Sequence, residues 1–134
     1  MNQHYLLDTC AWLDAFSTPE FLRANVRQLI DRQQVIHIAS ISLLEVARKE
    51  AAGKLHLGVP IADYCRIALP RNRVKILEIS PEIAIDSTRL PEWDHKDPGD
   101  CLIVATARVH RLTVLTCDAK ILAYPHVKSL ATRK

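Results

Sequence analysis

Short apolar runs alternate with segments of helical spacing along the chain, and this alternation constrains the fold more than any other feature of the sequence. The runs that we interpret as strands cover residues 4–8, 35–40, 74–79 and 112–118, with a candidate fifth, edge strand at residues 127–130. Their apolar character is nearly continuous, as in strands covered on both faces. Strands that alternate with helices form a parallel sheet with helices on both sides. We therefore predict one α/β domain over residues 1–134, a three-layer α/β/α sandwich with a mainly parallel central sheet of four to five strands.

The segments between these strands carry apolar residues with the spacing of one helix face. We expect helices at residues 9–16, 19–34, 42–52, 61–69, 81–90, 97–111 and 119–124. Pro19 and Pro81 stand in the first turn of their helices, where proline is tolerated. The segment 97–111 is apolar on nearly every side, so we predict that its helix is central and buried.

The composition permits a nucleic-acid partner without demanding one. The formal net charge of +3 is mildly basic. Four cysteines occur without a CxxC or zinc-ligand spacing, and we interpret them as buried thiols in a reducing compartment. No apolar run reaches the roughly 18 residues that a membrane span needs, and the N-terminal residues lack the basic start of a signal peptide. We therefore expect a cytoplasmic protein.

Acidic residues stand near the start of several predicted helices, and each of them alone has a structural explanation. A carboxylate at a helix start accepts hydrogen bonds from free backbone N–H groups and favours the positive end of the helix dipole. Asp97, which precedes Pro98, has the pattern of an N-cap. Glu45 lies three residues after Ser42, as in a capping box. Taken singly, these acids therefore indicate caps rather than ligands.

Four of the acids, considered together, also have the pattern of a metal-binding site. Asp8 and Asp118 end the first and fourth strands, and Glu45 and Asp100 lie near the start of helices. In a parallel sheet, strand ends and the helix starts that follow them lie at one edge, so the four carboxylates should meet there. Close carboxylates raise one another's pKa, a penalty that a divalent cation removes, and oxygen ligands select Mg²⁺ or Mn²⁺ over zinc. The pattern predicts metal-assisted hydrolysis of a phosphodiester.

Four stretches of the chain also resemble, in order, the motifs of PIN-domain ribonucleases. They are LLDTCAWL (6–13), SLLEVARK (42–49), HKDPGDCLIVATA (95–107) and TVLTCDAKILAY (113–124), and the third is the most specific. The size and single-domain layout are similar to those of the VapC toxins of type II toxin–antitoxin systems. The resemblance implies a PIN-like fold and an Mg²⁺- or Mn²⁺-dependent endoribonuclease, the toxin of a pair that inhibits translation or growth.

The resemblance also implies which residues form the site. The catalytic carboxylates of the family fall on Asp8, Glu45, Asp100 and Asp118, and the metal would be held by Asp8, Asp100 and Asp118.

Supporting roles follow from the same motifs. Thr9 and Thr116 match hydroxyl residues that could orient a water on the metal. Asp97 matches the first aspartate of the third motif, and we interpret it as mainly a helix cap with an alternative role near the metal. Cys10 departs from the family, which often has a small polar residue at that position.

Several basic residues are candidates for contact with RNA phosphates. Arg48 follows Glu45 by one helical turn, and Lys96 adjoins the acidic segment. Lys54, Arg71 and Arg73 are weaker candidates, since single surface cations usually serve solubility.

Family resemblance further implies a cognate antitoxin and a homodimer. Trp12 most simply packs a helix face, although an exposed Trp12 would be a candidate anchor for a partner. We expect Asp14 to face solvent, because it lies one and a half turns beyond Asp8.

Two other functions compete with the nuclease. A catalytically silent module could retain the PIN fold for protein or RNA binding, although such a module should have lost part of the carboxylate set. A phosphohydrolase or receiver domain also gathers acids at the edge of a parallel sheet, but the first strand end, LLDTC, lacks the second aspartate of a DxD nucleophile motif.

Overall fold

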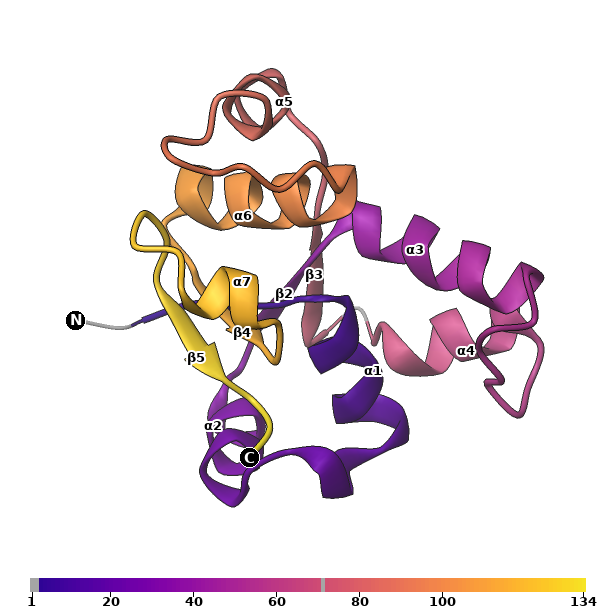
Figure 1. Ribbon diagram of the computed structural model, residues 1–134. Helices are drawn as coiled ribbons and strands as arrows, with labels where there is room; N and C mark the ends of the chain where they lie inside the picture. The colour runs from indigo at the N-terminus through magenta and orange to yellow at the C-terminus, as the bar shows by residue number, and fades with distance from the viewer. Residues whose placement is uncertain (1–2, 71) are drawn as a thin grey trace.

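The computed structural model describes residues 3–70 and 72–134 of the chain. A parallel sheet forms its centre (Figure 1), with strand order β3-β2-β1-β4-β5. The strands are β1 (Tyr5–Leu7), β2 (Ile36–Ala39), β3 (Val74–Leu77), β4 (Thr113–Thr116) and β5 (Ser129–Ala131). The predicted strands, including the candidate edge strand, are therefore confirmed to within two residues at their ends.

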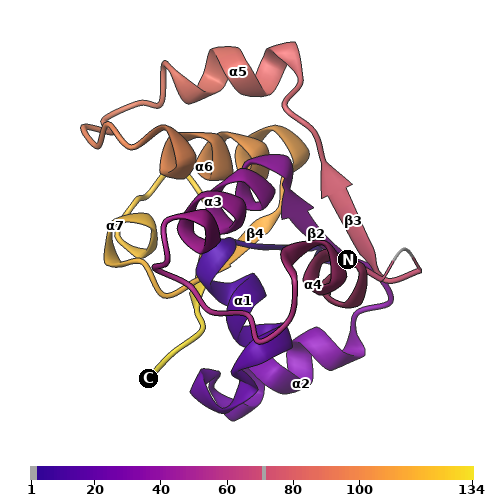
Figure 2. The same ribbon diagram turned by 90° about the vertical axis from the view of Figure 1, so that its right-hand side faces the viewer.

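Helices cover both faces of this sheet. They are α1 (Thr9–Ser17), α2 (Ala24–Arg32), α3 (Ser40–Ala51), α4 (Ile61–Ala68), α5 (Pro81–Ser87), α6 (Pro98–His110) and α7 (Ala119–Leu122), with a 3₁₀ turn η1 (Pro19–Phe21) between the first two. Figure 2 shows α5 and α6 on one side of the sheet and α1, α2 and α4 on the other. Two separate apolar clusters correspond to these two sides. The predicted three-layer α/β/α architecture is confirmed.

Strand β1 lies between β2 and β4. This placement determines which residues lie side by side at the carboxyl ends of the strands. Leu7 pairs with Ile38 on one side and with Leu115 on the other. The backbone N–H of Asp8 continues the ladder by donating to the carbonyl of Leu115 at 3.2 Å. The residues that follow β1 and β4 are therefore neighbours in space, although about a hundred residues separate them in the chain.

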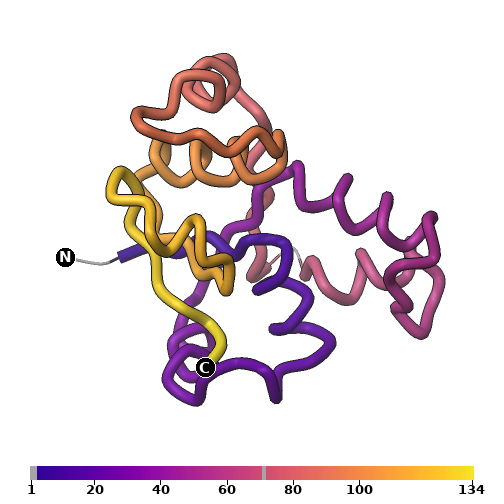
Figure 3. Tube along the Cα trace, viewed as in Figure 1, coloured from indigo at the N-terminus to yellow at the C-terminus, as the bar shows by residue number. Residues whose placement is uncertain are grey.

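The segment 19–34 is not one helix, in contrast to the prediction. The chain makes the 3₁₀ turn, passes through an extended Leu22 and starts α2 only at Ala24. At the break, the N–H of Arg23 donates to the carbonyl of Thr132 at 2.8 Å, so the C-terminal segment takes the place of a helical hydrogen bond (Figure 3). This contact spans most of the chain, and the local helical spacing contains no sign of it.

Trp12 and Asp14 both lie inside the molecule. Trp12 is fully buried and donates from Nε1 to the carbonyl of Ala68 at 3.0 Å, which excludes it as an exposed anchor for a partner. We expected Asp14 to face solvent, but it is buried. Both of its carboxylate oxygens accept from the Arg133 guanidinium at 2.8 Å. The paired charges make burial of the aspartate possible.

No helix in the described part of the chain is long and apolar enough to cross a membrane.

Replacing Arg133 with methionine should destabilise the protein, because it leaves the buried Asp14 carboxylate without its cation. We expect the free energy of unfolding to fall by about 2–3 kcal/mol, below the usual cost of breaking a fully buried pair because Arg133 is partly exposed. Urea unfolding measures the change. Lys134→Met, which removes an exposed neighbouring charge, is the matched control and should change stability little. Equal stability of the two variants would contradict a structural role for the ion pair.

Candidate active site at the carboxyl edge of the sheet

Asp8 is the most enclosed acid of the site, with 5% of its surface exposed. It follows β1 and is the N-cap of α1, where Oδ1 accepts from the backbone N–H of Ala11 at 2.8 Å. Its other oxygen, Oδ2, accepts a hydrogen bond from the hydroxyl of Thr116. Both oxygens are thus held, one by the helix that Asp8 starts and the other by the adjacent strand.

Thr116 connects two of the acids. As the last residue of β4, it donates its hydroxyl proton to Asp8, and its Oγ1 accepts from the backbone N–H of Asp118 at 2.9 Å. Asp118 in turn caps the short helix α7 by accepting from the N–H of Lys120 at 2.8 Å. One hydroxyl therefore fixes the segment after β4 relative to the end of β1.

Asp100 lies in the first turn of α6, where its Oδ2 is 3.2 Å from the ammonium nitrogen of Lys120. Burial raises the pKa of Asp100, the hydrogen bond from Lys120 opposes this, and the negative charges of Asp97 and Asp118 add to the rise. Lys120 thus belongs to the site, although we did not select it from the sequence. Its position two residues after Asp118, in the first turn of the helix that this acid caps, is the available signal.

The electrostatics of Asp8 show that the acids share one neighbourhood. Burial raises the pKa of Asp8 to about 6, while the hydrogen bonds from Thr116 and from the Ala11 N–H act in the opposite direction. The negative charges of Asp118 and Asp100 make a smaller contribution to this rise in the pKa. The structure therefore brings Asp8, Asp100 and Asp118 together at one edge of the sheet, as predicted.

Glu45 reaches the same edge from α3. The predicted capping box is wrong, because α3 begins at Ser40 and Ser42 is a buried residue inside the helix. Glu45 instead accepts a hydrogen bond on Oε1 from the hydroxyl of Thr9, which also lies 2.8 Å from the hydroxyl of Ser42. These contacts hold the carboxylate against the start of α1, one residue after Asp8.

Gly99 allows Glu45 to approach α6. A Cβ atom at position 99 would lie 2.7 Å from Oε2 of Glu45, closer than a carbon and an oxygen can normally stand. The Glu45 carboxylate therefore rests against the helix start that carries Asp100. We did not identify Gly99 from the sequence, because nothing in its local context distinguishes it from an ordinary residue of the first helical turn.

Asp97 does not act as the predicted side-chain cap. It occupies the N-cap position of α6 but its side chain accepts no hydrogen bond from that helix, and the residue is exposed. Its connection to the site is electrostatic, through its effect on the pKa of Asp100. The hydroxyls of Thr9 and Thr116 each donate a proton to a carboxylate, Glu45 or Asp8, and keep acceptor capacity with which they could orient a water.

The basic candidates divide into two groups. Arg48 and Lys96 are exposed, as are Lys54 and Lys120, and Lys120 alone of these has a contact with one of the four acids that the structure describes. Arg73 instead donates to the carbonyls of Ile30 and Gln33 at the end of α2, so its role is structural. Arg71 lies outside the described residues.

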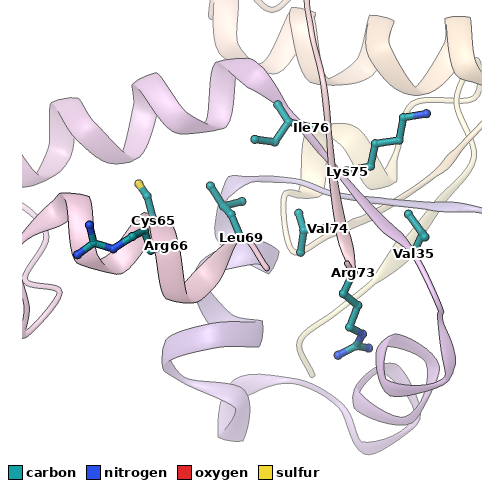
Figure 4. Close-up of a pocket in the computed structure, with 8 residues that line it drawn as sticks. All are labelled: Val35, Cys65, Arg66, Leu69, Arg73, Val74, Lys75 and Ile76. Atoms are coloured by element: carbon teal, nitrogen blue, oxygen red, sulfur yellow. The ribbon is translucent and has the colours of Figure 1, made fainter. Parts of the chain in front are cut away.

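The hollow drawn in Figure 4 is separate from the carboxylates. Its volume is about 590 Å³ and it lies between α4 and the edge strand β3, where Val35, Leu69 and Ile76 are among the residues that line it. None of the four carboxylates lines it, although Arg73 does. The acids therefore lie outside this hollow.

The donor set at this rim suits a hard cation. All four acids offer oxygen ligands, and two of them, Asp8 and Asp100, have a raised pKa partly because of the neighbouring negative charges. Among the described residues, however, no three acidic, histidine or cysteine side chains converge on one point closely enough to enclose an ion. Carboxylate oxygens are the donors that hard divalent cations prefer, and such a cation is commonly held by one or two carboxylates together with water and substrate phosphate.

Comparison with known proteins identifies the family. The sequence profile of the PIN domain family matches residues 5–127, a range that includes all four carboxylates. The chain belongs to the PIN-domain family. The resemblance noted from the sequence motifs is thereby confirmed.

Individual relatives of this PIN domain include toxin–antitoxin proteins. The chain is 27% identical to Ribonuclease VapC22 of Mycobacterium tuberculosis over 108 residues, 81% of this chain and 82% of the relative. A toxin–antitoxin complex from Klebsiella pneumoniae contains a chain that is 27% identical with a TM-score of 0.64, covering 92% of this chain and 94% of that one. VapBC2 of Rickettsia felis, bound to a DNA fragment from its promoter, has a TM-score of 0.74 at 20% identity, with 97% and 99% of the chains covered.

The raised pKa of Asp8 predicts a pH dependence of stability for the metal-free PIN domain. The folded protein holds this proton more tightly than the unfolded chain, whose ordinary value is 3.8. The resulting stabilisation is complete below about pH 4 and is lost as the pH rises through about 6. In chelator, the free energy of unfolding of the wild type relative to Asp8→Asn should therefore fall by roughly 2 kcal/mol between pH 4 and 7. A constant difference across this range would contradict the burial of an uncompensated carboxylate at this position.

Proposed function

We propose that this PIN domain is an Mg²⁺- or Mn²⁺-dependent endoribonuclease and the toxin of a toxin–antitoxin pair. The observation that carries the proposal is the gathering of Asp8, Glu45, Asp100 and Asp118 at one edge of the sheet, in a chain of the PIN family. Similarity to a relative named as a ribonuclease supports RNA as the substrate. A silent binding module would not require all four carboxylates.

Asp8, Asp100 and Asp118 are the residues that would hold the cation. A bound divalent ion supplies stabilisation of the negative charge that develops on the phosphate and acidifies a water molecule for attack. The hydrogen bonds from Thr116 and Ala11 orient the Asp8 carboxylate before any ligand arrives. Preorganised ligands of this kind reduce the cost of assembling the site during the reaction.

Glu45 and the cations complete the proposed machinery. Thr9 holds the Glu45 carboxylate beside the α6 start, where it can accept a proton or a hydrogen bond from the attacking water. Lys120, which is exposed and lies next to Asp100, is positioned to pair with a substrate phosphate. The exposed Arg48 and Lys96 would extend this contact along the RNA backbone.

The proposed partners follow from the relatives. Because similar chains occur in toxin–antitoxin complexes, we infer that a cognate antitoxin protein binds and inhibits this chain. RNA cleavage by the free toxin would inhibit translation or growth in the cytoplasm. A homodimer is the oligomeric state that we expect.

Substitution of Asp100 or Asp118 with asparagine should reduce Mg²⁺-dependent cleavage of single-stranded RNA at least 100-fold, because the amide cannot neutralise the cation. Thermal unfolding should remain cooperative. Asp94→Asn is the matched control, since Asp94 is an almost fully exposed acid in the loop before α6. Its cleavage rate should equal that of the wild type, and chelation by EDTA should abolish both activities. Undiminished cleavage by Asp100→Asn would show that the site has been assigned to the wrong residues.

Gly99→Ala should reduce cleavage about tenfold without lowering stability. The added methyl group displaces the carboxylate of Glu45, whereas alanine in a helix is favoured over glycine by about 1 kcal/mol. The rate and the melting temperature should therefore change in opposite directions. Glu45→Gln supplies the control, because the double variant should be no slower than Glu45→Gln alone if Gly99 acts through that side chain. Additive losses would argue for a separate effect on α6.

A further inference from the structure

Two cysteines flank the carboxylate site just beyond the ends of the neighbouring strands β1 and β4. Leu7 of β1 pairs with Leu115 of β4, so Cys10, three residues beyond the first, and Cys117, two residues beyond the second, leave the sheet at the same place. Their sulfur atoms are 3.2 Å apart. The sequence suggested buried thiols for all four cysteines, but the structure leaves each of them free and only partly buried. A small oxidant can therefore reach this pair.

The geometry of the pair is close to that of a disulfide. A disulfide bond is about 2.05 Å long, so the two sulfurs would need to approach by roughly 1 Å. Cys10 lies in the first turn of α1, whereas Cys117 lies in the short connection between β4 and α7, outside any helix or strand. Rotation of the side chains with a small adjustment of this connection can supply the approach.

We propose that Cys10 and Cys117 are a redox modification site at which a peroxide converts the two thiols to an intramolecular disulfide, and that this crosslink reversibly lowers nuclease activity. In the reaction, the peroxide O–O bond breaks and the S–S bond forms. The two sulfurs together lose two electrons to the peroxide, and their protons leave with its oxygen atoms as water when the oxidant is hydrogen peroxide. A thiol reductant reverses the change by exchange through a mixed disulfide.

The effect on activity follows from the sequence neighbours of the two sulfurs. Cys10 is two residues after Asp8 and directly precedes Ala11, whose N–H holds the Asp8 carboxylate. Cys117 stands between Thr116, which donates to Asp8, and Asp118. Contraction of the sulfur contact therefore shifts groups that position two acids at once. A displacement of about 1 Å can reduce a catalysed rate up to 100-fold. This half of the proposal rests on the proposed nuclease function.

The other two cysteines provide the controls. Cys65 belongs to α4 and lines the hollow of Figure 4, and Cys101 lies in α6, where its thiol contacts the carbonyl of His95 at 3.5 Å. Neither residue flanks Thr116 or Asp118 in the sequence. A variant that carries Cys65→Ser and Cys101→Ser retains the pair as its complete set of thiols, and adding Cys10→Ser to that variant leaves Cys117 without a partner.

The test treats both variants of the full chain with hydrogen peroxide and then blocks the remaining thiols with iodoacetamide. In the variant that retains the pair, we expect a loss of two hydrogen atoms, protection from alkylation and a peptide that joins Cys10 to Cys117 in mass spectrometry. RNA cleavage should fall at least tenfold and recover with dithiothreitol. The variant with Cys10→Ser should keep its cleavage rate during a brief treatment.

Each half of the proposal has its own contradicting result. Continued alkylation of both thiols, or a crosslink between two molecules, would overturn the pairing. Formation of the internal disulfide with an unchanged cleavage rate would overturn the effect on activity. If the reduced wild type itself cleaves no RNA, the proposed function fails and the effect on activity fails with it, while the peptide map still decides whether the two cysteines pair.

Discussion

The parallel pairing of β1 with β4 is the constraint on which the rest of the site depends. It places the end of the first strand beside the end of a strand more than a hundred residues later, and the hydroxyl of Thr116 then bridges Asp8 and the backbone of Asp118. The buried aliphatic residues of the two strands make this pairing stable, because each strand is covered by helices on both faces. Apolar burial thus determines the positions of the polar groups of the candidate site.

The same pairing of β1 with β4 brings negative charges close together, and hydrogen bonds and a nearby ammonium group reduce the resulting repulsion. The carboxylates of Asp8 and Asp100 lose hydration on burial and are repelled by neighbouring negative charges, and both effects raise their pKa. Hydrogen bonds from Thr116 and from helix N–H groups offset part of this cost, and the ammonium of Lys120 offsets another part at Asp100. The cation of the proposed function would replace this repulsion with attraction.

Much of the fold and the placement of the four acids at one edge of the sheet could be predicted from the sequence, because strand ends and helix starts are local patterns with a fixed relation in parallel sheets. The contacts that refine the site could not. Glu45 has the spacing of a capping box, yet its actual partner is Thr9 from another segment. Gly99 matters through the carboxylate that approaches it, and Asp14 is buried because Arg133 comes back to it. These features depend on tertiary distances, which no local pattern records.

The bond between Asp14 and Arg133 also has a consequence for biosynthesis. The two residues are 119 positions apart, so the ribosome makes the acid early and its cation almost at the end of the domain. Until Arg133 is present, burial of the Asp14 carboxylate of α1 would leave an unpaired charge in the protein interior, which is energetically costly. Domains generally fold as units during or after translation. The nascent chain therefore gains the stabilisation of this ion pair only after Arg133 has emerged from the ribosome.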